Sequence, residues 1–410
     1  MRGVIGIAIG SWVIRYLGPE KFGTLNFCIA FVAVFSSVAS VGLNGIAQKA
    51  IIQNRRLQYL ILGSCATLQI LGALISISII LGSTYISELD YEKYRILFAI
   101  LSAGFLFKTS EVLKYWFETE KKVFIPIWVE LVAFLCVTLL RVMFILSELG
   151  LFWFAGLILL ESCLIFSGMI FIYSLQNKFA LGLWSASKSY CHELIQSSWP
   201  AIFSGFVLLL QASSDLIVLG MLSSPAEVGY YSSALRLIEV AAVLPMLLRS
   251  SYLPMVLEKK TESDEGFNLE MINYYRLSFI TAVLILIPIC IFSKSITHLF
   301  FGEQFAPAAI LLAFMSFRIL FVHMGVARSV YLLASDYLRY SLVTTLLGAA
   351  LNIALNFILI EKYGALGAIL ANSITYVFIV FIVDFISPNT RLNAKLMYYA
   401  IFTSYKLLKK

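Results

Sequence analysis

Residues 59–83 read YLILGSCATLQILGALISISIILGS and contain no Asp, Glu, Lys or Arg. A helix rises about 1.5 Å per residue, so about 20 apolar residues cross the roughly 30 Å apolar core of a bilayer. The stretch therefore predicts a membrane-spanning helix. Apolar runs recur along the chain near residues 3–16, 23–46, 59–83, 94–116, 124–146, 151–174, 197–222, 229–254, 272–293, 306–333, 338–360 and 364–386.

The composition of the 410 residues agrees with this number of spans. Hydrophobic residues make up 60% of the chain and charged residues 13%, against about 45–50% and about 25% in an average soluble domain. Twelve spans of about 20 residues use about 240 residues, which is close to the whole hydrophobic share. We predict an all-α polytopic membrane protein with about twelve transmembrane helices. A soluble enzyme, a disulfide-rich secreted scaffold and a disordered chain are excluded.

The first apolar run, residues 3–16, is shorter than the others. At about 1.5 Å per residue it reaches only about 21 Å, less than the apolar thickness of a bilayer. We expect that the natural start of the protein lies upstream of Met1.

Basic residues flank the predicted spans unevenly. With the N-terminus inside, seventeen Lys and Arg residues fall in inner segments and six in outer loops. Because Lys and Arg concentrate in cytoplasmic loops, we predict that both termini are cytoplasmic and that the number of spans is even. The net charge of +7 follows from the same bias, and no nucleic-acid partner is expected.

Two short sequence echoes suggest that the chain is built from two related halves. Pro19–Gly23, between the first two spans, resembles Pro225–Gly229, between spans 7 and 8, and Phe144–Gly150 resembles Phe357–Gly364. Two halves in the same orientation form a parallel repeat, an arrangement found in transporters. We predict a six-helix bundle at 1–190, a second at 191–390 and a basic cytoplasmic tail at 391–410.

No motif for covalent chemistry or for a bound cofactor is present. The sequence lacks a phosphate-binding GxxxxGK[ST] loop, a CxxC pair and a second His near His192-Glu193. The polar stretches at 176–195 and 257–271 are too short for a catalytic domain. We expect no enzyme activity, no cofactor and no metal site.

Ionisable residues inside the spans are the main functional signal, because a charge in the bilayer core is costly and usually faces an interior cavity. Lys108, Glu111, Lys114 and Glu118 fall on one face of span 4, where they either neutralise one another or line a cavity. Arg249 and Arg328 lie near the cytoplasmic end and are expected to snorkel. The other charged candidates are Glu130, Arg141, Glu161, Asp215, Arg236, Glu239 and Arg318.

Glu118 lies just past the end of the predicted span 94–116, so the spans hold seven basic residues against five acidic residues, which predicts a basic cavity. Lys108 falls in the inner half and Arg141, Arg236 and Arg318 in the outer half of the membrane, so together they can carry an anionic head group across it. Arg stays charged when desolvated and binds phosphate through two parallel hydrogen bonds. The alternative is that these basic residues pair with acidic residues on neighbouring helices.

Several stretches resemble polysaccharide flippases of the multidrug/oligosaccharidyl-lipid/polysaccharide (MOP) exporter superfamily. Arg15–Gly23 is similar to the loop after their first helix. Trp199-Pro200, Asp215 and Glu227–Glu239 resemble the signature of their spans 7 and 8. The helix 11–12 join is similar at Asn352, Asn356 and 363–368, and Glu111–Tyr115 with Glu130 and Arg141 resembles the O-antigen (Wzx-type) members.

This resemblance implies a MATE-like fold with two six-helix bundles around a central cavity that works by alternating access. It implies transport of an undecaprenyl-pyrophosphate-linked oligosaccharide, an O-antigen or capsule repeat unit, from the cytoplasmic to the periplasmic leaflet of a bacterial inner membrane. The expected partners are this lipid-linked oligosaccharide, membrane lipids and other polysaccharide assembly proteins. The resemblance also allows for ion coupling, and the carboxylates to test for it are Asp215, Glu130 and Glu161.

Three alternatives remain open from the sequence. A drug or cation exporter of the same superfamily would share the fold but would favour an acidic cavity. A membrane-embedded polysaccharide polymerase would carry a larger outer loop with catalytic residues. A lipid II flippase would usually have two further helices.

Overall fold

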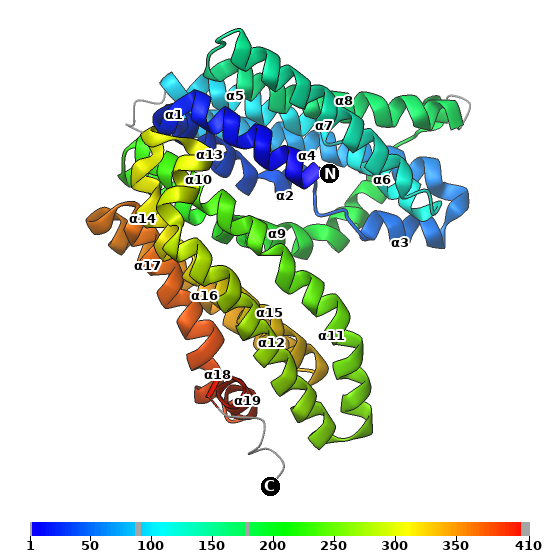
Figure 1. Ribbon diagram of the computed structural model, residues 1–410. Helices are drawn as coiled ribbons and strands as arrows, with labels where there is room; N and C mark the ends of the chain where they lie inside the picture. The colour runs from blue at the N-terminus through cyan, green and yellow to red at the C-terminus, as the bar shows by residue number, and fades with distance from the viewer. Residues whose placement is uncertain (1, 87–91, 177–179, 403–410) are drawn as a thin grey trace. The chain divides into compact units, whose positions relative to one another are not determined.

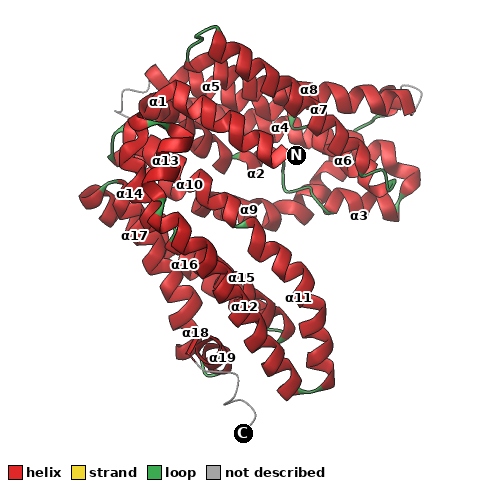
Figure 2. Cartoon of the chain, in the orientation of Figure 1, coloured by secondary structure: helices red, strands yellow, loops and turns green. Residues whose placement is uncertain are grey.

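The chain is helical throughout the part that the structure describes. The computed structural model describes residues 2–86, 92–176 and 180–402, and in these ranges it contains helices and loops and no strand (Figure 2). Ten helical stretches within them are long and apolar enough to cross a membrane. They coincide with ten of the predicted spans, and the prediction of an all-α polytopic membrane protein is confirmed. The stretches are Arg55–Thr84, Tyr94–Thr119, Phe124–Leu146, Leu151–Gln176, Lys188–Leu222, Pro225–Glu262, Asp264–Ile291, Glu303–Ala334, Leu338–Tyr363 and Ala365–Ile386.

The first predicted span, 3–16, and the first half of the second, 23–46, lie in a single interrupted helix, and the second half of span 23–46 is broken into α2 (Ser36–Ala39) and turns before α3 (Ile46–Gln53). Helix α1 (Arg2–Val34) contains Gly18 with a φ of 72°, directly before Pro19. Glycine adopts this left-handed conformation without steric cost, and the proline ring removes one hydrogen-bond donor from the helix. These two residues divide α1 at the point where the sequence analysis placed the loop between the spans.

The chain divides into two compact units. The first comprises Met1–Leu17 and Thr24–Ile217, and the second comprises Gly18–Gly23 and Val218–Lys410. The division falls inside helix α9, whereas the sequence analysis placed the boundary between the bundles at 190/191. The described helices that fall mainly in the first unit are α1, α2 (Ser36–Ala39), α3 (Ile46–Gln53), α4 (Gln58–Ile86), α5 (Glu92–Phe107), α6 (Ser110–Thr119), α7 (Phe124–Leu146), α8 (Leu151–Gln176) and α9 (Lys188–Leu222), with 3₁₀ turns at Arg55–Leu57 and Ala180–Leu183.

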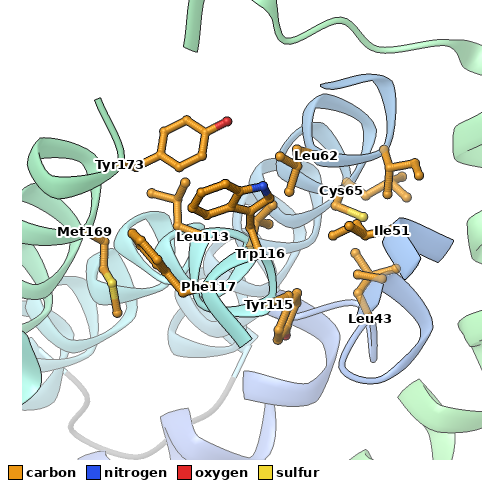
Figure 3. Packing of buried hydrophobic residues seen from close by; sticks show 14 of the residues in the cluster. Leu43, Ile51, Leu62, Cys65, Leu113, Tyr115, Trp116, Phe117, Met169 and Tyr173 are labelled. Carbon is orange, nitrogen blue, oxygen red and sulfur yellow. The ribbon is translucent and has the colours of Figure 1, made fainter. Parts of the chain in front are cut away.

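An aromatic cluster holds α6 and α8 together in the first unit. Trp116 packs edge-to-face on Tyr173, with ring centroids 5.0 Å apart, and on Phe117 at 5.1 Å (Figure 3). The Nε1 of Trp184 donates a hydrogen bond to the hydroxyl of Tyr173 at 3.1 Å. Edge-to-face contacts place the positive ring edge on the negative face and add to the gain from burial. The cluster fixes α6, which follows the polar turn of the candidate site.

The second unit has its own core around α12. Tyr274 and Tyr275 are fully buried, and Tyr274 stacks on Tyr252 of α11 with centroids 4.7 Å apart. The unit contains α10 (Pro225–Ala241), α11 (Val243–Glu262), α12 (Asp264–Ile291), α13 (Ser293–Phe301), α14 (Ala306–Met315), α15 (Phe317–Ala334), α16 (Leu338–Tyr363), α17 (Ala365–Tyr376), α18 (Val383–Ile386) and α19 (Arg391–Phe402), with a 3₁₀ turn at Glu303–Phe305 and a π-helix at Val377–Ile382.

The two Pro-x-x-x-Gly motifs, Pro19–Gly23 and Pro225–Gly229, are in contact within the second unit. A Cβ atom on Gly23 would lie 1.8 Å from the carbonyl oxygen of Pro225, and one on Gly229 would lie 2.0 Å from the carbonyl oxygen of Pro19. The contact is reciprocal, since each glycine lies against the backbone of the proline of the other motif. Only a residue without a side chain allows two helix backbones to approach this closely.

Candidate functional site

A polar cavity lies in the first unit, next to the turn between α5 and α6. Lys108 and Thr109 form this turn, where the backbone N–H of Glu111 donates to the carbonyl of Lys108 at 2.8 Å. The cavity has a volume of about 210 Å³. Its lining residues come from this turn and from α5, α6, α7 and α8, and they are Phe107, Lys108, Ser110, Glu111, Lys114, Glu130, Ser162, Ile165 and Met169.

Charged side chains line one part of this cavity in a definite pattern. The Nζ of Lys114 lies 3.0 Å from the Oε1 of Glu130 on α7. Glu111 accepts a hydrogen bond from the hydroxyl of Tyr115 at 3.3 Å. The Lys108 Nζ lies 5.5 Å above the ring centroid of Phe105 and, in residues 2–86, 92–176 and 180–402, forms no ion pair. Lys108 is therefore the cation of this cavity that is available to an anionic ligand.

The polar stripe predicted on span 4 is not neutralised within itself. Lys114 pairs with Glu130, and Glu118 at the end of α6 accepts a hydrogen bond from the side-chain amide of Gln48 on α3. Lys114 and Glu118 thus contact two different helices outside the stripe. Of the two predicted roles, the structure supports a lined cavity for Lys108, Glu111 and Lys114.

Arg141 and Glu161, which the sequence analysis named separately, face each other across α7 and α8. The Nη2 of Arg141 lies 3.4 Å from the Oε2 of Glu161, and both side chains are mostly buried. The pairing corresponds to the alternative in which a basic residue meets an acidic residue on a neighbouring helix. Neither residue lines the cavity around Lys108.

The remaining predicted site residues lie on three further helices. Asp215 is buried on α9 in the first unit, and Arg236 is exposed on α10 in the second. The guanidinium of Arg318, on α15, lies 5.8 Å from the ring centroid of Tyr376. Arg318 lines a hollow of about 10 Å³, which has room for about one water molecule. The predicted binding residues are thus divided between the units, with Lys108 and Arg141 in the first and Arg236 and Arg318 in the second.

The expectation that Arg328 snorkels toward the cytoplasm is wrong. The Arg328 side chain is 7% exposed, and its Nε and Nη2 donate to the two carboxylate oxygens of Asp384 at 2.8 and 2.7 Å. Asp384 also accepts from the hydroxyl of Tyr340 at 3.0 Å and from the Nδ2 of Asn393 at 2.7 Å. A buried ion pair is tolerated when additional hydrogen bonds satisfy both charges, which is the case here.

Asp384 is the residue that the sequence analysis missed. It lies inside the predicted span 364–386 and reduces the excess of basic over acidic residues in the spans. A single acid in the run VFIVFIVDFI was the available signal. Its partner was not visible in the sequence, because Arg328 lies 56 positions away on another helix and the contact depends on how the helices pack.

A second cavity, of about 470 Å³, lies at one end of the second unit. Lys260 and Asp264, which form an ion pair at 2.7 Å, line it beside the turn between α11 and α12. Asp336 lines it from the turn between α15 and α16, and Asn389 from the turn after α18. The three turns therefore meet at the same end of this unit.

The chain matches known families in sequence and in fold. A model of the family described as "Polysaccharide biosynthesis protein" matches residues 11–260. The chain is 24% identical over 168 residues to a probable low-salt glycan biosynthesis flippase, Agl15, of Haloferax volcanii. That match covers 40% of this chain and 34% of the relative, so the chain matches about a third of the relative's length.

Two solved structures share the fold over nearly the whole chain. An inward-facing multidrug resistance MATE family transporter of the MOP superfamily aligns with a TM-score of 0.75 and 14% identity, covering 98% of this chain and 96% of that one. The lipid II flippase MurJ in an inward closed conformation aligns with a TM-score of 0.77 and 15% identity, covering 100% and 90%. The MATE-like fold that the sequence motifs implied is confirmed. Because the family model covers more than half of the chain, the protein belongs to the polysaccharide biosynthesis protein family.

Proposed function

We propose that the protein is a flippase for a lipid-linked oligosaccharide. The substrate is an undecaprenyl-pyrophosphate-linked O-antigen or capsule repeat unit, which moves from the cytoplasmic to the periplasmic leaflet of a bacterial inner membrane by alternating access. Family membership, the flippase relative and the MATE-like fold support this function. The protein acts as a transporter and carries out no covalent step.

The cavity around Lys108 is the observation that carries the proposal. Lys108 is a cation without an ion-pair partner among the described residues, in a polar cavity within a predicted span. A charged side chain inside a membrane span is costly, and such residues usually mark the path of a substrate or an ion. A pyrophosphate supplies the charge that would offset that of Lys108. We assign Lys108, Arg141, Arg236 and Arg318 to the pathway of the pyrophosphate. Arg141 exchanges its contact with Glu161 for the phosphate when the substrate passes.

Ion coupling is assigned to carboxylates close to these basic residues. Glu130 shares the cavity with Lys108 and pairs with Lys114, and Glu161 pairs with Arg141. When a cation or proton binds the carboxylate, the paired base is released toward the anionic substrate. Asp215, buried on α9, is the third carboxylate of this set.

The test is transport of a fluorescent lipid-linked oligosaccharide in proteoliposomes, with each of the four basic residues changed to Ala. Lys108→Ala is expected to reduce the rate by more than tenfold, because a hydrogen-bonded charge contact is worth about 1.5–3 kcal/mol. Lys49→Ala and Arg56→Ala, at exposed positions of the same unit, are the controls and should keep the normal rate. Arg141→Lys retains the charge but loses the two-point contact with phosphate.

Two results would contradict the proposal. Full transport by the protein with all four changes would remove the assigned pathway. Vesicles that accumulate a cationic dye but leave the lipid-linked oligosaccharide in its original leaflet would identify a cation exporter instead. Protein amounts in the vesicles are compared by gel, so that a loss of rate is not mistaken for a loss of protein.

A further inference from the structure

Helix α19 lies across the end of the second unit. It follows the last predicted span, Ala365–Ile386, after the short turn 387–390. Figure 1 shows α19 nearly end-on, whereas α12 and α16 of the same unit extend along the page. A helix that lies crosswise to spanning helices is parallel to the membrane surface.

One face of α19 is attached to the unit. Asn393, Ala394, Leu396, Met397 and Ala400 are buried, with the spacing of a single helical face. Asn393 donates to Asp384 at 2.7 Å and accepts from the hydroxyl of Tyr275 on α12 at 2.6 Å. The carbonyl of Ala400 accepts from the Nε of Arg276 at 3.4 Å. These bonds hold α19 at a fixed rotation about its own axis.

The opposite face of α19 carries exposed aromatic and basic residues together. Tyr398 is 53% exposed and Phe402 is 69% exposed. Lys395 lies beside them on the same face, and Arg391 is exposed one turn earlier. Aromatic side chains gathered on one exposed helix face are unfavourable in water. Aromatic rings next to Lys and Arg are typical of helices that lie in the head-group region of a membrane.

The charge of this segment indicates which lipid it contacts. Residues 391–410 contain no Asp or Glu, and their basic residues are Arg391, Lys395, Lys406, Lys409 and Lys410. A cluster of basic residues immediately after a spanning helix attracts anionic lipid head groups, by about 1 kcal/mol or about fivefold for each residue. A zwitterionic lipid offers no comparable attraction.

We propose that α19 is an interfacial helix that binds anionic phospholipids on the side of the membrane where the last span ends. Tyr398, Tyr399 and Phe402 enter the head-group region, and Lys395 contacts the lipid phosphates. Arg391 contributes less, because its Nε already donates to the carbonyl of Phe385 at 3.0 Å. Through Asn393 and Asp384, α19 then connects the lipid surface to the buried ion pair of the second unit.

The experiment measures amide hydrogen exchange of α19 in the full chain, reconstituted in nanodiscs of phosphatidylcholine alone or with about a quarter phosphatidylglycerol. We expect slower exchange in residues 391–402 with phosphatidylglycerol. Lys395→Gln should reduce this protection about fivefold. About 1 M salt, at which the Debye length falls to about 3 Å, should abolish the difference between the two lipid mixtures.

Lys362→Gln is the matched control. Lys362 is an exposed lysine at the C-terminal end of α16, whereas the N-terminal end of α16 contacts Asp384 through Tyr340. This change should leave the protection of α19 unchanged. Exchange in α16 serves as an internal reference for folding. Equal exchange of α19 in the two lipid mixtures would overturn the proposal and leave this face to a protein partner. An equal effect of Lys362→Gln and Lys395→Gln would also overturn it.

Discussion

Arg328 and Asp384 form a two-point ion pair in the interior of the second unit, with N–O distances of 2.8 and 2.7 Å. The two residues are 56 positions apart and belong to α15 and α18. Tyr340 and Asn393 complete the hydrogen bonds of the carboxylate. One ion pair therefore joins α15, α16, α18 and α19, and its loss should affect all four helices.

Removing the carboxylate should destabilise the protein strongly. Asp384→Ala leaves the Arg328 guanidinium buried without its partner, a change that costs about 3–5 kcal/mol. The measurement is the melting temperature of the purified protein in detergent. Glu262→Ala removes one partner of an exposed pair with Lys259 and should leave the melting temperature nearly unchanged, because solvent screens an exposed ion pair.

A double substitution distinguishes the cost of the unpaired Arg328 charge from the cost of lost packing around Asp384. Arg328→Met combined with Asp384→Leu removes both charges, and its melting temperature should lie above that of Asp384→Ala alone, because no unpaired charge remains. A double variant that melts below the single variant would contradict this explanation.

At the scale of helices, the crossing of Pro19–Gly23 and Pro225–Gly229 depends on two glycines. The Cβ positions at Gly23 and Gly229 are 1.8 and 2.0 Å from backbone oxygens of the opposite motif. A backbone oxygen cannot rotate out of the way as a flexible side chain can. Any larger residue in place of Gly23 or Gly229 must therefore push the two helices apart. Glu227 reinforces the same region, where its Oε2 accepts from the N–H of Ala365 at 2.8 Å, at the start of α17.

Gly229→Ala should therefore weaken the second unit. Inserting a methyl group into a tightly packed contact costs about 1–3 kcal/mol. The fraction of protein that remains monodisperse in size-exclusion chromatography after heating measures the loss. Gly156→Ala in α8 is the control, because a Cβ at that position meets nothing within 4 Å. It should be neutral or gain up to about 1 kcal/mol from helix propensity, and an equal loss in both variants would contradict the role of the crossing.

For the whole molecule, three turns of the second unit that were predicted to lie on one side of the membrane meet at one end of this unit. Predicted spans 8, 10 and 12 all end inside, and the cavity lined by Asp264, Asp336 and Asn389 brings the turns after these spans together. We propose that both termini are cytoplasmic, since this end is also the one that continues into the basic residues 391–410.

Reporter fusions test this orientation in a bacterium. Green fluorescent protein fused after Lys410 should fluoresce, because it folds in the cytoplasm, and alkaline phosphatase at the same position should be inactive. Alkaline phosphatase fused after Gly302, between predicted spans 9 and 10, should be active. The reverse result at either position would contradict the proposed orientation.

Part of the candidate site was also predictable from the sequence. Lys108 and Glu130 were selected because each is a charge inside an apolar run, and the structure brings both to one cavity. That the two residues share a cavity was not predictable, because it depends on how α5, α6, α7 and α8 pack. For the same reason, the sequence did not show that Arg141 faces Glu161.

By itself, the sequence determined the helical class, the position of ten spans and the resemblance to polysaccharide flippases. The physical reason is that an apolar run of about 20 residues must span a bilayer whatever its neighbours are. Only the tertiary structure decided the partners of Arg328 and Gly229. Both contacts join segments that are distant in the sequence, and such contacts form only after the helices have packed.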